Sequence, residues 1–173
     1  VTGTLTRKRL LISARVLGRR FAAITEPGEA VGVLLPNANG AVVTFFGLQS
    51  GGRIAAMLNY TSGPANIASA VRTAKIRTIV SSRAFIEKAE LGDLVTAIDG
   101  TGAKILWLEE VRETISTQEK LEAALLWSRP LHPVKPEDAA VILFTSGSEG
   151  TPKGVVLSHC NLHSNAAQAD ARV

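Results

Sequence analysis

Short apolar segments alternate with longer stretches of helical character along the first 108 residues of the chain. Four of these segments are rich in β-branched residues and have the length of ordinary strands: residues 31–35, 54–58, 78–81 and 105–108. Strands that are separated by helices usually pair in parallel through crossover connections. The pattern therefore predicts an α/β fold with a layered, parallel-rich sheet and crossover helices.

Three of the expected helices have recognisable first turns. Thr6 can cap the first helix, Pro64 suits the opening turn of another, and Ser116 with Glu119 has the spacing of a capping box. The stretch 128–138 contains three prolines, which fix φ and remove backbone donors, so we expect it to be a surface connection. This connection leads into the segment that carries the candidate chemistry.

The first helix carries a concentration of positive charge. Six basic residues and no acid fall within the first twenty positions: Arg7, Lys8, Arg9, Arg15, Arg19 and Arg20. The apolar residues of the segment form one stripe at helical spacing: Leu10, Ala14, Leu17 and Phe21. The basic residues are therefore expected on the solvated face of a packed helix, while a role toward an acidic partner or an anionic membrane surface stays open.

The composition excludes several classes of protein. Hydrophobic residues make up 46% of the chain and charged residues 20%, which fits neither a disordered chain nor a membrane span. The net charge is +4, but no nucleic-acid-binding motif and no interleaved aromatic platform accompanies it, so no nucleic acid partner is expected. The single cysteine, Cys160, cannot form an internal disulfide and fits a reducing compartment.

Two further apolar runs flank a polar loop near the end of the sequence. Residues 139–144 (AAVILF) and 154–157 (GVVL) are typical of strands. The ten residues 145–154, TSGSEGTPKG, contain four hydroxyl side chains, three glycines and a lysine. Glycines bring backbone N–H groups close to anions, hydroxyls donate hydrogen bonds, and lysine supplies a positive charge. This combination predicts a loop that binds phosphate groups.

Two other interpretations of this loop are weaker. Gly147 and Lys153 have the spacing of a Walker A loop, but Pro152 and Gly154 replace its final glycine and its Mg²⁺-binding hydroxyl. The following residues look like a strand, whereas a Walker A loop opens a helix. An ordinary flexible Gly/Ser hairpin would not need this placement of lysine and hydroxyl groups. A hairpin that holds phosphates is the favoured interpretation.

The segment from residue 144 to residue 159 resembles the signature of the adenylate-forming (AMP-binding) superfamily, which includes acyl-CoA synthetases, luciferases and peptide-synthetase adenylation domains. Four segments are similar to the synthetase half of bacterial bifunctional 2-acylglycerophosphoethanolamine acyltransferase/acyl-[acyl-carrier-protein] synthetases: residues 31–38 (VGVLLPNA), 53–61 (RIAAMLNYT), 76–88 (IRTIVSSRAFIEK) and 140–156. The resemblance covers nearly the whole chain. It implies that residues 1–173 are an incomplete N-terminal portion of an AMP-binding domain and belong to its N-terminal subdomain.

The resemblance implies a two-step reaction that uses ATP and Mg²⁺. A fatty acid carboxylate attacks the α-phosphorus to give acyl-adenylate and pyrophosphate, and the thiol of acyl carrier protein then takes the acyl group. The residues implied to bind the nucleotide are Thr145, Ser146, Gly147, Ser148, Gly150, Thr151, Lys153 and Gly154. Lys153 would also act in catalysis by offsetting the charge of the leaving pyrophosphate, and His159 would lie near the substrate carboxylate. Glu149 has no assigned role, because a carboxylate beside a triphosphate is repulsive.

The same resemblance implies features that lie outside this sequence. A 2-acyl-lysophospholipid would be handled by an upstream acyltransferase domain, in the cytoplasm or at the cytoplasmic face of a bacterial inner membrane. The start at Val1 and the lack of the family's later adenine, ribose and lysine motifs lead us to expect an incomplete chain that is inactive alone.

Two other functions stay open at this point. The whole protein could be a long-chain acyl-CoA synthetase, which passes the acyl group to coenzyme A. The chain could also be a non-catalytic interaction module that binds acidic partners through its basic first helix. A metal site within the protein is not expected, because His159, Cys160 and His163 lack the further ligand that a zinc site needs.

Overall fold

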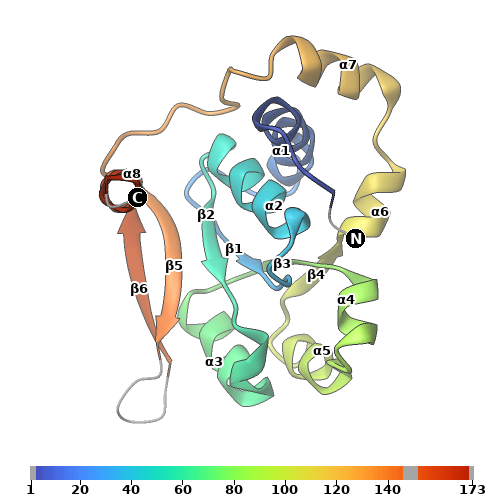
Figure 1. Cartoon of the computed structure of the whole chain (residues 1–173). Coiled ribbons are helices and arrows are strands. Elements are labelled where there is room, and N and C mark those ends of the chain that lie inside the picture. Colours follow the sequence, from blue (N-terminus) through green and yellow to red (C-terminus); the bar gives the residue numbers. More distant parts are fainter. Residues whose placement is uncertain (1–2, 146–151, 172–173) are drawn as a thin grey trace.

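The computed structural model describes residues 3–145 and 152–171, which are built around one six-stranded sheet (Figure 1). The strands are β1 (Ala30–Val33), β2 (Ile54–Met57), β3 (Thr78–Ser81), β4 (Lys104–Trp107), β5 (Ala139–Thr145) and β6 (Lys153–Ser158). Their order is β4-β3-β1-β2-β5-β6, and neighbouring strands are parallel except for β5 and β6. The predicted parallel-rich α/β fold is confirmed, with strand ends that differ from the expected ones by no more than two residues.

Helices cover both faces of the sheet. They are α1 (Arg7–Ala22), α2 (Asn39–Ser50), α3 (Pro64–Thr73), α4 (Arg83–Lys88), α5 (Gly92–Asp99), α6 (Leu108–Glu113), α7 (Thr117–Leu125) and α8 (His159–Asp170), with a short 3-10 helix at Tyr60–Ser62. From β1 the chain crosses to β2 through α2, returns to β3 and β4 through α3, α4 and α5, and reaches β5 through α6 and α7 (Figure 1). Since crossovers of this kind are right-handed, each reversal of direction moves the connecting helices to the opposite face.

Each face of the sheet has its own apolar core. Ile79 of β3 is fully buried in the cluster formed with α3 and α5, where Ile67 is one of its neighbours. The next residue, Val80, belongs to the cluster on the other face, together with Phe21 of α1 and Leu48 of α2. Because successive strand residues point to opposite faces, the continuous apolar runs of the sequence supply both cores at once.

The helices α1 and α2 cross at a pair of glycines. A Cβ atom added at Gly18 would lie 2.7 Å from the Gly47 carbonyl oxygen, and one added at Gly47 would lie 3.0 Å from the Ala14 carbonyl oxygen. Neither position leaves room for a side chain. The two backbones can therefore approach closely, and this brings both helices down onto the sheet.

Helix α7 packs against α1 through ion pairs, so the prediction of a wholly solvated basic face on α1 is only partly correct. Arg19 pairs with Glu122, and Arg20 pairs with Glu119 at 2.7 Å. Arg15 is buried and donates a hydrogen bond to a backbone carbonyl of the connection after α7. Three of the six cations thus bind groups of the same chain, so they are not available to an external acidic partner.

The predicted helix starts are confirmed. The Thr6 hydroxyl accepts a hydrogen bond from the Arg9 amide at 3.3 Å, and Pro64 is the first residue of α3. Ser116 and Glu119 form a reciprocal capping box at the start of α7.

Residues 126–138, all of which are described, form neither helix nor strand. In the described part of the chain, no helix has both the length and the apolar character to cross a membrane.

Candidate functional site

The β5–β6 hairpin presents both ends of the predicted phosphate loop at one edge of the sheet (Figure 1). Thr145 ends β5, Lys153 begins β6, and the two residues are paired in register. The Thr145 hydroxyl donates to the Lys153 carbonyl at 3.5 Å. The other predicted phosphate-binding residues lie outside the described residues: Ser146, Gly147, Ser148, Gly150 and Thr151. Their roles stay predictions, and Glu149 lies in the same segment.

The hairpin is anchored in the core at one end only. Residues 140–142 of β5 are buried, whereas Leu143 and Thr145 are exposed. Gly154 stands opposite Phe144, and a Cβ atom there would lie 3.2 Å from a methyl group of Ile142. The glycine therefore lets β6 lie close against β5 where the hairpin leaves the core. The loop end of the hairpin faces α3 across a shared cavity.

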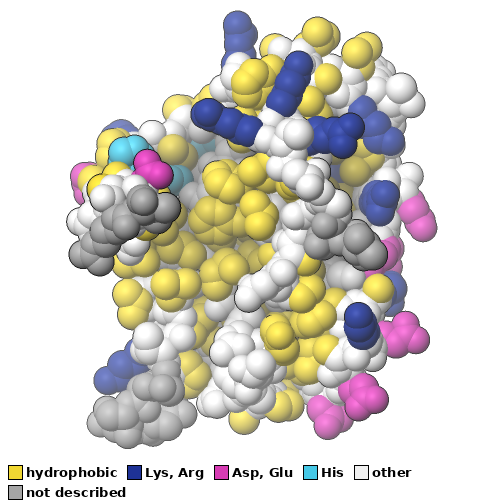
Figure 2. Space-filling model, in the orientation of Figure 1, with side chains coloured by type: hydrophobic (Ala, Val, Ile, Leu, Met, Phe, Trp, Pro, Cys, Tyr) yellow, Lys and Arg dark blue, Asp and Glu magenta, His cyan; other side chains and the backbone are white. Residues whose placement is uncertain are grey.

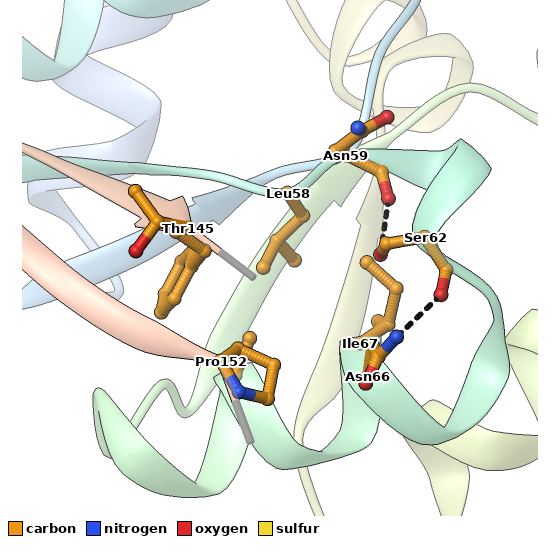
Figure 3. Close-up of a pocket in the computed structure, with 9 residues that line it drawn as sticks. Leu58, Asn59, Ser62, Asn66, Ile67, Thr145 and Pro152 are labelled. Carbon is orange, nitrogen blue, oxygen red and sulfur yellow. Dashed lines mark hydrogen bonds between the residues drawn. The ribbon is translucent and has the colours of Figure 1, made fainter. Parts of the chain in front are cut away.

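A cavity of about 440 Å³ opens beside the hairpin, near the carboxyl ends of β2 and β5 (Figure 3). Thr145 and Pro152 line its hairpin side, and Asn66 and Ile67 line the side formed by α3. None of the described residues that line it is charged. In open α/β sheets, ligands bind outside the carboxyl ends of the strands, so this cavity is well placed for a ligand that also reaches the loop.

Three polar residues of this cavity were not predicted as site residues: Asn59, Ser62 and Asn66. The Ser62 hydroxyl donates to the Asn59 carbonyl at 2.7 Å, and the Asn66 amide donates to the Ser62 carbonyl at 2.8 Å (Figure 3). The Asn59 side-chain oxygen accepts from the Thr61 amide and hydroxyl, so its NH₂ group remains as a donor. Polar residues between the predicted strand 54–58 and the helix start at Pro64 were the available signal.

The described residues of the hairpin fit the phosphate groups of ATP. Lys153 is exposed, so its ammonium group is accessible to an anion at the loop end of the hairpin. Thr145 supplies a hydroxyl, and Gly154 leaves its backbone uncovered by a side chain. Among the described residues, no group of three or more His, Cys, Asp and Glu side chains is arranged to hold a metal ion.

The structure places His159 at the opposite end of the hairpin from Lys153. His159 is the first residue of α8, and its amide donates to the Asp138 carbonyl, just before β5 begins. The whole of β6 separates it from Lys153, and the six residue steps between them correspond to about 20 Å at 3.4 Å per residue. It lines a shallow pocket with Cys160 and His163. The two predicted site residues are therefore not brought together by these elements, and a role for His159 beside the substrate stays a prediction.

Several known proteins of similar sequence are named as CoA ligases or acyl-CoA synthetases. A 4-coumarate–CoA ligase of Pinus taeda is 30% identical over 165 residues, which make up 91% of this chain and 28% of that relative. The peroxisomal long chain acyl-CoA synthetase 7 of Arabidopsis thaliana is 51% identical over 53 residues, or 31% of this chain and 8% of that relative. The chain thus spans little more than a quarter of the length of the first of these relatives.

Solved structures confirm the fold. A benzoate CoA ligase from Burkholderia xenovorans LB400 superposes with a TM-score of 0.75 at 19% identity, covering 96% of this chain and 32% of that one. ATP-bound MatB from Rhodopseudomonas palustris gives a TM-score of 0.68 at 21% identity, covering 92% of this chain and 30% of that one. The family model described as AMP-binding enzyme matches residues 2–173. The chain therefore belongs to the AMP-binding enzyme family.

Proposed function

We propose that the whole protein activates a fatty acid carboxylate with ATP as an acyl-adenylate and then transfers the acyl group to a thiol. The observation that carries this proposal is the β5–β6 hairpin, which pairs Thr145 with Lys153 at the ends of the predicted loop. The family match over residues 2–173 supports the adenylate-forming step. Similarity to a long chain acyl-CoA synthetase over 53 residues supports a fatty acid as the carboxylate.

The residues of this chain would act mainly by positioning and charge. ATP with Mg²⁺ supplies the adenylyl group that makes the carboxylate reactive. Lys153 would hold the outer phosphates and offset the negative charge that develops as pyrophosphate leaves. The Thr145 hydroxyl would give up its long hydrogen bond to the Lys153 carbonyl and donate one to the same oxygens. Gly154 leaves the backbone accessible, so that the phosphates can approach the strand closely.

The acceptor thiol is the finer part of the proposal. Segments 31–38, 53–61 and 76–88 favour acyl carrier protein, with a 2-acyl-lysophospholipid as the later recipient of the acyl group. The relatives named as CoA ligases favour coenzyme A as a second candidate. Both candidates share the same first half-reaction, so the choice between them affects only the transfer step.

Exchange of labelled pyrophosphate into ATP tests the first half-reaction in the whole protein. We expect exchange that depends on a long-chain fatty acid such as palmitate and that is weaker with 4-coumarate. Addition of acyl carrier protein or of coenzyme A to separate samples then identifies the acceptor by the thioester that forms. Exchange with 4-coumarate but not with palmitate would replace the fatty acid by an aromatic acid. No exchange with either class of acid would overturn the proposal.

A further inference from the structure

A second groove lies on the opposite face of the sheet from the hairpin cavity, between α1, α2 and α6. It has a volume of about 560 Å³, within the range of small-molecule sites. Its walls are mainly apolar side chains: Ile12, Val16, Leu17, Val43, Leu108 and Ile115. The hairpin cavity instead lies against α3, so the two sites are separated by the sheet.

The polar side of this groove is positive. Arg112 of α6 and Lys120 of α7 line it, and no acidic residue is among the described lining residues. Both side chains are exposed, so their apolar stems can cover the groove while the charged ends stay in water. No ion pair in the described part of the chain involves Arg112 or Lys120. Their charges are therefore available to a ligand.

Four of the acids on α6 and α7 have partners outside the groove. Glu109 accepts hydrogen bonds from the Ser82 hydroxyl and the Arg83 amide, and Glu110 pairs with the Arg83 side chain. On α7, the two acids Glu119 and Glu122 pair with α1. The acids of α6 and α7 that have identified partners thus bind residues outside the groove, while the cations of these helices line it.

The first turn of α1 is also positive, although none of its residues lines the groove. Arg7, Lys8 and Arg9 occupy this turn without any acid, although cations at a helix N-terminus are opposed by the helix dipole. Arg9 precedes the groove residues Ile12 and Ser13 by three and four positions, so it lies on the same side of the helix. Charge arrangements that are unfavourable for folding, such as this basic first turn of α1, are often found at binding sites.

We propose that this groove binds the single chain of a long-chain fatty acid, as an accessory site separate from the nucleotide site. The alkyl chain would lie against the apolar walls, and the carboxylate would meet Arg112 and Lys120. An apolar slot with cations at its rim and no acid is complementary to an anionic amphiphile in both charge and polarity. The binding requires neither ATP nor an acceptor thiol, so it can be tested apart from the proposed reaction.

Fluorescence of cis-parinaric acid, a fatty acid probe, measures this binding directly on the 173-residue chain without nucleotide. We expect saturable binding that is displaced by palmitate. Shortening the competitor should weaken displacement by about fourfold for each methylene that leaves the walls. Hexadecyltrimethylammonium has the same chain but a positive head, and it should displace the probe poorly.

Charge reversal locates the site. The double variant Arg112→Glu/Lys120→Glu should raise the dissociation constant of the probe at least tenfold, as expected when two attractive contacts become repulsive. The matched control Lys88→Glu/Lys104→Glu makes the same change of charge at exposed lysines outside the groove and should leave binding unchanged. Ser13→Phe fills the groove without altering charge and should also abolish binding, which keeps the test valid if the double variant unfolds.

Three results would overturn the proposal. Equal weakening by both double variants would show a general charge effect. Loss of binding in Phe46→Ser, which alters the exposed apolar surface of α2 outside this groove, would place the probe elsewhere. Binding to vesicles of anionic phospholipid, without binding of the monomeric probe, would show a membrane-binding surface instead. Failure of fatty acids in pyrophosphate exchange would leave this measurement unaffected.

Discussion

Arg53 shows how one buried cation can join separate elements. Only 5% of its surface is exposed, yet its guanidinium donates to the Thr25 hydroxyl at 3.1 Å and to backbone carbonyls of Ala22, Thr25 and Gly51. Two of these carbonyls belong to the end of α1 and the turn after it. Arg53 therefore satisfies groups that the helix leaves unpaired, and it ties them to the start of β2.

Arg53→Met should lower the free energy of unfolding by roughly 2–4 kcal/mol, because it leaves the buried carbonyls of Thr25 and Gly51 without this donor. Urea denaturation followed by circular dichroism measures this loss. Arg77→Met is the matched control: Arg77 is exposed and pairs with Glu29 at 2.8 Å, and surface pairs contribute about 0.2–1 kcal/mol. Similar losses in the two variants would contradict the role given to Arg53.

Glu109 is a second residue whose environment predicts a measurable effect. Burial opposes its ionisation, but hydrogen bonds from the Ser82 hydroxyl and the Arg83 and Ala84 amides outweigh burial and hold the pKa of Glu109 below its ordinary value of 4.5. A carboxyl group with a lowered pKa in the folded state stabilises that state above its unfolded pKa, and the contribution is lost as the pH falls.

Glu109→Gln should therefore remove part of the acid sensitivity of the fold. The wild type should lose stability as the pH drops below about 4.5, and the variant should lose less over the same window. Thermal unfolding midpoints measured from pH 7 to pH 3 give the comparison, with Glu87→Gln as an exposed control from α4. Identical pH profiles for wild type and Glu109→Gln would be inconsistent with a pKa lowered by folding.

At the scale of elements, the hydrophobic pattern predicted the strands well because parallel, buried strands need continuous apolar runs. Residues 78–81 and 139–144 are examples, since the structure has strands there with nearly the expected ends. The docking of α7 on α1 could not be predicted. Arg19 and Glu122 are far apart in sequence, and nothing in local spacing shows that they meet. The cavity around Asn59 could not be predicted for the same reason. It forms only when β2 and β5, which are far apart in sequence, become neighbours in the sheet.

The crossing of α1 and α2 predicts a difference between two glycine substitutions. Gly18→Ala places a methyl group 2.7 Å from a backbone oxygen, so it should destabilise the fold by about 1–3 kcal/mol despite the better helix propensity of alanine. Gly92→Ala, at the first residue of α5, meets no atom within 4 Å and should be neutral or slightly stabilising. Chemical denaturation of the two variants measures the difference, and a stabilised Gly18→Ala protein would refute the close crossing.

At the scale of the whole molecule, one face of the described chain is more apolar than a solvent-exposed surface normally is. Val42 and Phe46 of α2 are 43% and 41% exposed, and Leu143 and Val155, paired across β5 and β6, are 41% and 43% exposed. Hydrophobic side chains gather over this face, between α2 and the hairpin (Figure 2). Contiguous exposed apolar surface usually marks a contact surface.

The isolated 173-residue chain should consequently self-associate at high concentration. Sedimentation velocity should show a rising average mass, and the double variant Phe46→Ser/Leu143→Ser should reduce it without loss of the folded state, because both side chains are already half exposed. A control at Ile24 and Leu125, which are exposed outside this face, should change little. A monomer at all concentrations would argue against this surface as a contact site.

The proposed role of Lys153 as the phosphate-binding cation is tested most directly by separating the two half-reactions in the whole protein. Lys153→Ala should slow adenylate formation by about 10²-fold or more, which is the usual cost of removing a preorganised hydrogen-bond donor from a site of developing negative charge. Transfer from preformed acyl-adenylate to the thiol should stay near the wild-type rate. Lys104→Ala, at the amino end of β4, should leave both rates unchanged. Equal slowing of both half-reactions by Lys153→Ala, or no slowing of either, would contradict the assignment of the β5–β6 hairpin to ATP.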